Sequence, residues 1–418
     1  MRSSLMRLIA LGPIVDGSSI CTEFIHMSDA ALYMSADEAA GALGVSLTTL
    51  YAYVSRKGIR SEKQPGSKSR RYWRADIEQT RQRGRPADPS AGLIKSTAIT
   101  LMTPKGPFYR GVSAIELAET ATIEDVARLL WNAPTAFAET TPIFAPQHGD
   151  VLVALSDLPR IARAIALFSL MEHTNPRAHD LTPQGYARTG AEAVRCFAAL
   201  VGGGSPDDRG PIHTVLARNL GLPPGYGDMI RRCLVLAADH ELDPTTYAVR
   251  AAANTGVTPY GAAMAGLVAG RGRRLHMGRV ETVSRFVEEF LTGDPKEAVL
   301  SRFRVGEPLP GFGRYLYADK DPRAQVLIAS LEQHAPAPTM RRFRTAADLI
   351  EDLTGAAPDF IVPTVLLGKV LGMKGEELAL STVGRMVGWI AHALEQYQDH
   401  ELFRPRASYA GPLPIQSR

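Results

Sequence analysis

The chain has 418 residues, of which 45% are hydrophobic and 22% are charged. These proportions are typical of a globular protein, and they exclude a disordered chain, a collagen-like chain and a disulfide-stapled miniprotein. The length predicts roughly two or three domains, or one large body with an appendage. Cys21, Cys196 and Cys233 are far apart in the sequence and form no CxxC motif. We therefore expect no metal site, no disulfide framework and a reducing, cytoplasmic location.

Two apolar segments have features of targeting or membrane sequences. Residues 1–30 contain a short apolar run flanked by arginines, but Gly12 and Pro13 break the run and no clean cleavage site follows. We interpret them as a loose extension in which Met27 is an alternative start. Residues 251–270 carry no charge and have the length of a membrane span. Their many small residues predict a tightly packed core helix instead, so we expect no membrane contact.

Positive charge is concentrated near the N-terminus. The chain has a formal net charge of +4, and residues 31–90 contain 11 basic against 6 acidic side chains. The remainder is therefore close to neutral. A local basic excess of this kind is typical of a segment that contacts a polyanion such as nucleic acid.

Residues 31–83 predict a small domain of two short helices and a wing. Ser35 precedes two acidic residues and is placed to cap the first helix, which Gly44 ends. Ser46 is placed to cap the second helix. The stretch 66–78 then predicts a two-stranded wing with a closing helix.

This order of elements resembles the winged helix-turn-helix domain of the MerR and excisionase type. The resemblance implies DNA contacts from the recognition helix and the wing through Thr48, Thr49, Tyr51, Lys68, Arg70 and Arg71. Basic side chains there would neutralise phosphates without reading the base sequence. The alternative is a small helical domain that serves protein contacts. Residues 84–92 contain glycine and proline and predict a linker.

From residue 93 to residue 418, the sequence predicts a mainly α-helical body. Apolar residues recur at steps of three and four, as in residues 112–131 and 190–201. Two short stretches, 94–101 and 106–112, predict a small hairpin.

Two histidines in this body stand beside helix ends. His240 ends an apolar helix, where a lone histidine is more often a cap than a catalyst. His276 follows a turn rich in glycine and arginine and begins a helix. The dipole at a helix start favours a neutral imidazole, which can donate a hydrogen bond to a developing enolate oxygen.

Two loops carry further candidate groups. The loop 310–314 is rich in proline and glycine, so its backbone amides can approach a ligand closely. Arg323 opens a helix after an Asp-Pro pair, which suits a bidentate grip on a carboxylate. Asp359 lies between apolar residues before an apolar helix. It is either a helix cap or a partly desolvated carboxylate whose pKa is raised toward that of a general base.

In this order, and followed by GRMVGWIAHALEQ and RPRASYAGP, these segments resemble the citrate synthase family over about residues 93–413. The resemblance implies a mainly α fold with a large domain and an inserted small domain at about residues 240–360. It also implies a homodimer with its active site in the cleft between the domains. The implied reaction condenses acetyl-CoA, as substrate, with oxaloacetate, and hydrolysis of the citryl thioester then gives citrate and free CoA without any cofactor.

The resemblance also implies roles for single residues. His240 would bind oxaloacetate, Arg323 and Arg404 would hold its carboxylates, His276 would stabilise the enol and Asp359 would remove the methyl proton. The implied coenzyme A contacts are Pro310, Gly311, Phe312 and Gly313.

Two positions depart from the family pattern. Arg314 stands where the family has a histidine that donates to the oxaloacetate carbonyl, and arginine keeps its proton. Met277 stands beside His276 where the family has a small residue, which could narrow the acetyl pocket. Two alternatives therefore stay open. One is a 2-methylcitrate synthase that uses propionyl-CoA. The other is a DNA-binding regulator whose degenerate body senses a CoA ester or a dicarboxylate.

Overall fold

The computed structural model describes residues 33–57, 59–64, 66–67, 69–74, 76–77, 80, 96–138, 144–272, 276–313, 317 and 319–399. The chain separates into two compact units, which we describe individually. The first comprises residues 1–93 with 405–418, and the second comprises residues 94–404.

The described residues of the first unit form helices and a small antiparallel sheet. Its elements are β1 (Tyr33–Met34), α3 (Ala36–Leu43), α4 (Leu47–Lys57), β2 (Ser61–Lys63) and β3 (Arg70–Trp73). The strand order is β1-β3-β2, and Tyr72 of β3 lies opposite Ser61 of β2. The sequence placed both wing strands within residues 66–78, whereas β2 precedes that stretch and β1 was not predicted. Both strands are too short to show a clear period of two.

Local signals explain helices α3 and α4 of this unit. The Ser35 hydroxyl accepts a hydrogen bond from the Glu38 amide, and the Glu38 carboxylate accepts one from the Ser35 amide. This capping box begins α3, and Gly44 ends it with a φ of 64°. The Ser46 hydroxyl accepts from the Thr49 amide at the start of α4. A small core fills the space between helices and sheet, formed by Met34, Ala39, Ala40, Leu50, Ile59, Tyr72 and Ile77.

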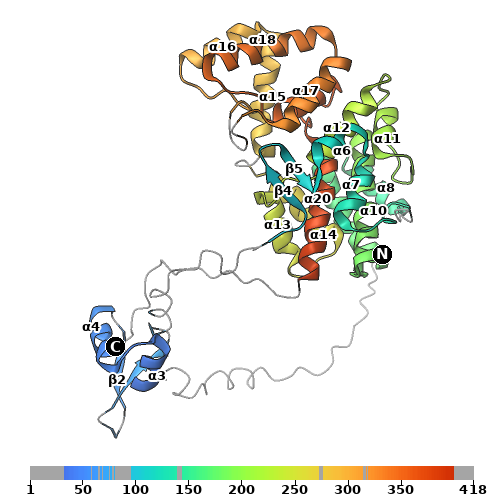
Figure 1. Cartoon of the computed structure of the whole chain (residues 1–418). Helices are drawn as coiled ribbons and strands as arrows, with labels where there is room; N and C mark the ends of the chain where they lie inside the picture. Colours follow the sequence, from blue (N-terminus) through green and yellow to red (C-terminus); the bar gives the residue numbers. More distant parts are fainter. Residues whose placement is uncertain are drawn as a thin grey trace, which may run out of the picture. The chain divides into compact units, whose positions relative to one another are not determined.

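The second unit is mainly helical, as the sequence predicts (Figure 1). It begins with an antiparallel sheet of β4 (Thr100–Thr103), β5 (Gly106–Tyr109) and β6 (Val112–Ser113), at the place of the predicted hairpin. Its first helices are α6 (Ala114–Thr120), α7 (Ile123–Trp131), α8 (Pro146–Ala154), α9 (Arg160–Thr174), η1 (Pro176–His179), α10 (Pro183–Gly202), α11 (Ile212–Asn219) and α12 (Tyr226–Ala237). They are followed by α13 (Pro244–Ala253), α14 (Pro259–Gly270), α15 (His276–Thr292), α16 (Pro295–Arg304), α17 (Pro322–His334), α18 (Ala337–Thr354), α19 (Ile361–Val370) and α20 (Ala379–Gln398).

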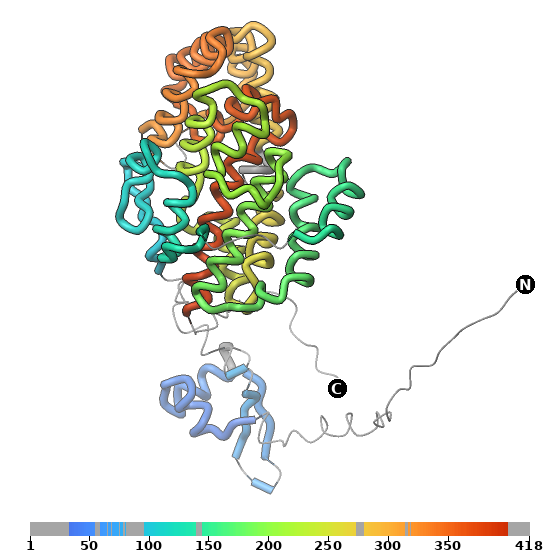
Figure 2. The backbone as a smooth tube through the Cα atoms, turned by 90° about the vertical axis from the view of Figure 1, so that its right-hand side faces the viewer, coloured from blue at the N-terminus to red at the C-terminus, as the bar shows by residue number. Residues whose placement is uncertain are grey.

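Helix α20 forms the centre of the second unit. It packs against α7, α10, α12, α13 and α14, and Figure 2 shows it running between them. Two glycines allow the close approach to α12: a Cβ at Gly384 would lie 2.2 Å from the Leu234 carbonyl oxygen, and one at Gly388 would lie 2.1 Å from that of Ala238. The end of α12 is thereby fixed against the middle of α20.

Helices α15 to α18 gather at one end of this unit (Figure 1). Helix α15 packs on α16, α18 and α19, and α17 packs on α12 and α19. The small domain expected at about residues 240–360 stays a prediction. The core helix expected over 251–270 is wrong in its extent, because α13 ends at Ala253 and α14 begins at Pro259. Among the described residues, no helix is both long and apolar enough to cross a membrane.

Candidate active site

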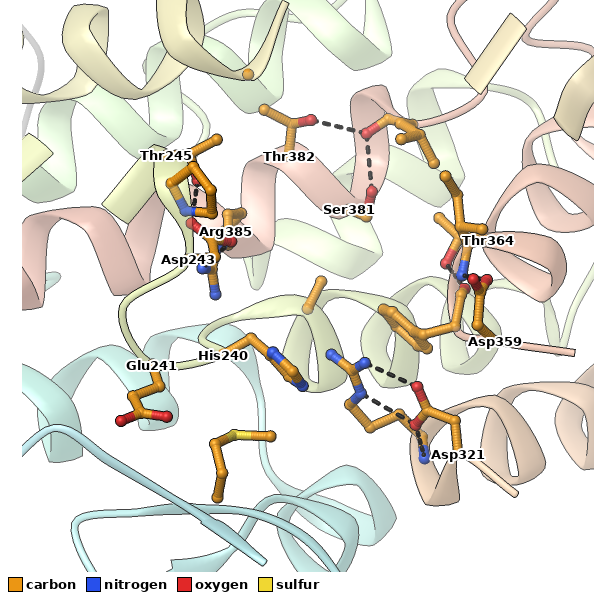
Figure 3. A pocket seen from close by; sticks show the side chains of 18 of the residues that line it. His240, Glu241, Asp243, Thr245, Asp321, Asp359, Thr364, Ser381, Thr382 and Arg385 are labelled. Atoms are coloured by element: carbon orange, nitrogen blue, oxygen red, sulfur yellow. Dashed lines mark hydrogen bonds and ion pairs between the residues drawn. The ribbon is translucent and has the colours of Figure 1, made fainter. Parts of the chain in front are cut away.

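The second unit contains a cavity of about 520 Å³. Its walls come from the turn between α12 and α13, the loop before α17, the start of α19 and the first half of α20, with Met102 of β4 at one side. Figure 3 shows His240 near the middle of this group, with Asp243 and Arg385 to one side of it and Asp321 and Asp359 to the other.

His240 reaches this cavity from the turn after α12, which ends at Ala237. Its Nε2 and the Tyr317 hydroxyl are 3.3 Å apart and hydrogen-bonded. Burial raises the pKa of Tyr317 to about 12, so its hydroxyl keeps its proton at neutral pH. The next residue, Glu241, has a φ of 57°, and its amide donates to the Asp239 carboxylate at 3.0 Å. A positive φ is rare outside glycine, and here it belongs to the tight turn that presents His240.

Arg323 is held by the residue that caps its own helix. The Asp321 carboxylate accepts from the Arg323 amide at 2.9 Å, and from Nε and Nη2 of the guanidinium at 3.1 and 2.8 Å. The guanidinium also lies 4.7 Å from the ring centre of Phe360 and 5.8 Å from that of Tyr317. Burial opposes its charge, but Asp321 outweighs burial and raises the pKa of Arg323 above its usual range. The predicted opening of α17 by Asp-Pro-Arg is therefore confirmed.

Asp359 lies beside the loop that was expected to bind coenzyme A. Its amide donates to the Gly311 carbonyl at 2.9 Å, and its carboxylate accepts from the Ile361 amide at 3.0 Å. Phe312 forms an antiparallel bridge with Pro358. Gly311 has a φ of 82°, and a Cβ there would lie 2.4 Å from the Val362 side chain. Backbone pairing thus joins residues 310–313 to Asp359, and both Gly313 and Asp359 line the cavity.

Arg385 also lines this cavity, although no role was predicted for it. Its guanidinium donates to the carboxylates of Asp239 at 3.2 Å and Asp243 at 2.5 Å, and to the Thr246 hydroxyl at 2.8 Å. Burial opposes ionisation of both acids, yet cationic neighbours, Arg385 among them, hold both pKa values below the usual range. The sequence signal that could have found Arg385 is an arginine between apolar residues of a helix. A charge with only 12% of its side chain exposed needs a partner.

The side chains of three predicted active-site residues lie outside the described part of the chain. His276 begins α15, as expected, but its side chain lies outside the described residues, as do Arg314 and Arg404. Helix α15 packs on α19, which begins just after Asp359. A meeting of His276 and Asp359 stays a prediction.

In the first unit, the predicted DNA contacts fall into two groups. Thr48 and Tyr51 of α4 are exposed, and Arg70 of β3 is exposed with one contact to the Ser61 carbonyl. Two others have partners within the unit: the Thr49 hydroxyl bonds to that of Ser46, and Arg71 forms an ion pair with Glu62. Lys68 lies outside the described residues. In the described part of the chain, no group of histidine, cysteine and acidic residues has the arrangement of a metal site.

A family model, the citrate synthase C-terminal domain, matches residues 91–406. Among curated proteins, the chain is 32% identical over 204 residues to putative citrate synthase 2 of Mycobacterium tuberculosis. The aligned residues are 46% of this chain and 53% of that protein, so the chain spans about half the length of this relative. It is 25% identical to citrate synthase 2 of Bacillus subtilis, in an alignment that covers 74% of this chain and 93% of that protein. It is 24% identical to a 2-methylcitrate synthase of M. tuberculosis, in an alignment that covers 76% of this chain and 88% of that protein.

Solved structures show the same fold. A citrate synthase from Thermoplasma acidophilum, in a ternary complex with carboxymethyl coenzyme A and oxaloacetate, matches with a TM-score of 0.63 at 21% identity, over 79% of this chain and 98% of that one. The citrate synthase of Pyrobaculum aerophilum matches with a TM-score of 0.64 at 24% identity, over 78% of this chain and 92% of that one.

Proposed function

The chain belongs to the citrate synthase family, and from this premise we propose that it is a transferase that condenses acetyl-CoA with oxaloacetate to citrate and free CoA. The observation that carries the proposal is the convergence of His240, Arg323, Arg385 and Asp359 on one cavity. They come from four separate segments of the chain, which the packing of α12, α17, α19 and α20 brings together.

The keto acid would bind first, in the part of the cavity beside His240 and the two arginines. Guanidinium groups suit carboxylates because they offer parallel donors in a fixed plane. Arg323 is held by Asp321 and two aromatic rings, so its orientation is set before substrate arrives. His240 would donate to the keto acid, with Tyr317 fixing the plane of its ring.

Asp359 would then act as the general base. A thioester α-proton is weakly acidic, so its removal requires a base together with a hydrogen-bond donor on the thioester oxygen. The start of α15 at His276, packed on α19, supports His276 as that donor. The resulting enol carbon would attack the keto carbon, and water would cleave the thioester to release the CoA thiol.

Release of free thiol from acetyl-CoA tests this proposal. We expect thiol release that depends on oxaloacetate, and citrate as the product. Propionyl-CoA in a parallel assay tests 2-methylcitrate synthesis. Binding of oxaloacetate without thiol release from either ester would contradict the enzyme and favour the sensing alternative. Arg314→His should raise the rate, because a histidine there could supply a transferable proton, a contribution of roughly 10²-fold or more. An unchanged rate would show that Arg314 does not limit turnover.

A second candidate function is nucleic-acid binding by the first unit. It is supported by the exposed Thr48 and Tyr51 on one helix and the exposed Arg70 on the neighbouring sheet. Duplex DNA should bind with an affinity that falls steeply as salt rises. No binding at low salt would remove this function and leave the condensation proposal intact.

A further inference from the structure

Among the described residues, two arginines line the cavity, and they differ in the number of carboxylates that each one contacts. Arg323 has one carboxylate partner, Asp321. Arg385 has two, Asp239 and Asp243. Arg385 therefore shares its single charge between two carboxylates, and less of that charge is available to attract an anion than at Arg323. A substrate carboxylate brought to Arg385 would be its third carboxylate partner.

The two partners of Arg385 differ in their exposure to the cavity. Asp239 is fully buried, and it also accepts a hydrogen bond from His392 at 3.1 Å. Asp243 lines the cavity and is 24% exposed. Figure 3 shows Asp243 and Arg385 together on the same side of the cavity. On the cavity side, the Asp243 carboxylate therefore lies where a bound anion would meet Arg385.

Apolar side chains contribute to the cavity wall, together with the hydroxyls of Thr245, Ser381 and Thr382. Leu242 and Pro244 flank Asp243, and Leu378 and Trp389 of the α20 region also line the wall. The Trp389 indole donates to the Thr245 hydroxyl at 3.3 Å, which fixes its ring. An uncharged end of a substrate would lose little hydration energy here, whereas a carboxylate would lose its water beside Asp243.

Resting on the proposed function, we propose that Asp243 is a specificity-determining residue. Its carboxylate competes with a substrate carboxylate for Arg385. The cavity therefore distinguishes only weakly between a 2-oxo dicarboxylate and a 2-oxo acid whose far end is uncharged. Removing the Asp243 charge should strengthen the preference for the dicarboxylate.

Asp243→Asn isolates this charge. Asp243 caps α13 by accepting from the Thr246 amide at 2.8 Å, and asparagine is an equally good N-cap. The measurement is calorimetric binding of oxaloacetate and of 2-oxobutanoate to the full chain. We expect the ratio of their affinities to shift about tenfold toward oxaloacetate in the variant, as removal of a neighbouring like charge predicts. An unchanged ratio, or a shift toward 2-oxobutanoate, would overturn the proposal.

Asp294→Asn is the matched control. Asp294 also caps a helix followed by proline, and it contacts the amides of Lys296 and Glu297. It should leave the ratio unchanged, and an equal shift there would also overturn the proposal. Asp243→Ser keeps a capping oxygen without charge and replaces the asparagine variant if that variant unfolds.

Binding and turnover separate this inference from the proposed function. If both acids bind with the expected shift but no thiol is released, condensation is wrong and the role of Asp243 stands. If thiol is released and the ratio does not respond to Asp243→Asn, the role of Asp243 is wrong and condensation stands. If neither acid binds to either protein, both are wrong.

Discussion

Asp359 is the residue whose side chain most directly tests the proposed chemistry. Asp359→Asn keeps an oxygen that can accept from the Ile361 amide, so the start of α19 should be preserved. The variant cannot accept a substrate proton as a carboxylate does. We expect oxaloacetate-dependent thiol release to fall by roughly 10²-fold or more, the usual contribution of a general base.

The control for Asp359→Asn is binding of the keto acid alone. Arg323 and Arg385 keep their partners in this variant, so calorimetric affinity for oxaloacetate should stay within about twofold of the wild-type value. Normal thiol release would contradict the assignment of Asp359 as the base. A parallel loss of binding would indicate that the loop joining Gly311 to Asp359 had moved.

Local signals at the residue scale pointed to several residues that line the cavity, among them His240, Arg323 and Asp359. Asp321, a cap followed by proline, placed Arg323 correctly at the start of α17. Arg385 was missed because its partners Asp239 and Asp243 are 146 and 142 residues away in the sequence. The sequence shows that a buried arginine needs an acid, and only the packing of α12 on α20 shows which acid. The same limit explains β1 and β2, because the pairing partner of a short strand lies outside any local window.

At the scale of elements, the contact between α12 and α20 positions His240 and Arg385 together. Gly388→Ala would bring a methyl group within 2.1 Å of the Ala238 carbonyl oxygen and 2.7 Å of the Asp239 carboxylate. The helices must then separate or the turn must shift. We expect the free energy of unfolding to fall by about 1–3 kcal/mol, measured by chemical denaturation.

Gly149→Ala is the matched control for Gly388→Ala. Gly149 lies inside α8, and a Cβ there has no heavy atom within 4 Å. Alanine should leave stability unchanged or raise it by up to about 1 kcal/mol. Similar destabilisation by both substitutions would show that the α12–α20 contact does not explain the effect.

The same contact predicts a pH dependence of stability. Burial opposes ionisation of Asp239, but His392 and Arg385 hold its pKa below the usual range. A lowered folded pKa stabilises the fold above the unfolded value of about 3.9, and this contribution is lost as the pH falls through the folded pKa. Asp239→Asn should cost about 3 kcal/mol at neutral pH, because it removes one partner of a buried ion pair.

Unfolding titrations of the wild type and of Asp239→Asn at several pH values test this prediction. The stability difference should shrink as the pH falls below about 4, where the wild type loses its own contribution. Glu124 and Glu192 have raised pKa values owing to burial, but they are present in both proteins and cancel in the difference. A difference that does not change with pH would contradict the ionised state of Asp239.

At the scale of the whole molecule, the chain combines two units of different character. The first has its own small core and belongs to the basic part of the sequence. The second contains the cavity and the family match. Several cations of the first unit already have partners, as in the ion pairs of Arg60 with Asp76 and Arg71 with Glu62. The net charge of this unit therefore overstates the number of cationic side chains that are available to bind phosphates.

Of the two predicted arginine contacts of the first unit, Arg70 is the better candidate for a phosphate contact, because its guanidinium makes a long contact of 3.4 Å with the Ser61 carbonyl, whereas Arg71 forms an ion pair with Glu62. Duplex binding by the full chain should be measured at several salt concentrations for the wild type and for Arg70→Ala. Loss of one phosphate contact should lower the slope of log affinity against log salt by about 0.9. Lys105→Ala removes an exposed cation from the second unit and should leave the slope unchanged. Equal effects of both substitutions would indicate general charge attraction, and an unchanged slope in Arg70→Ala would exclude Arg70 as a phosphate ligand.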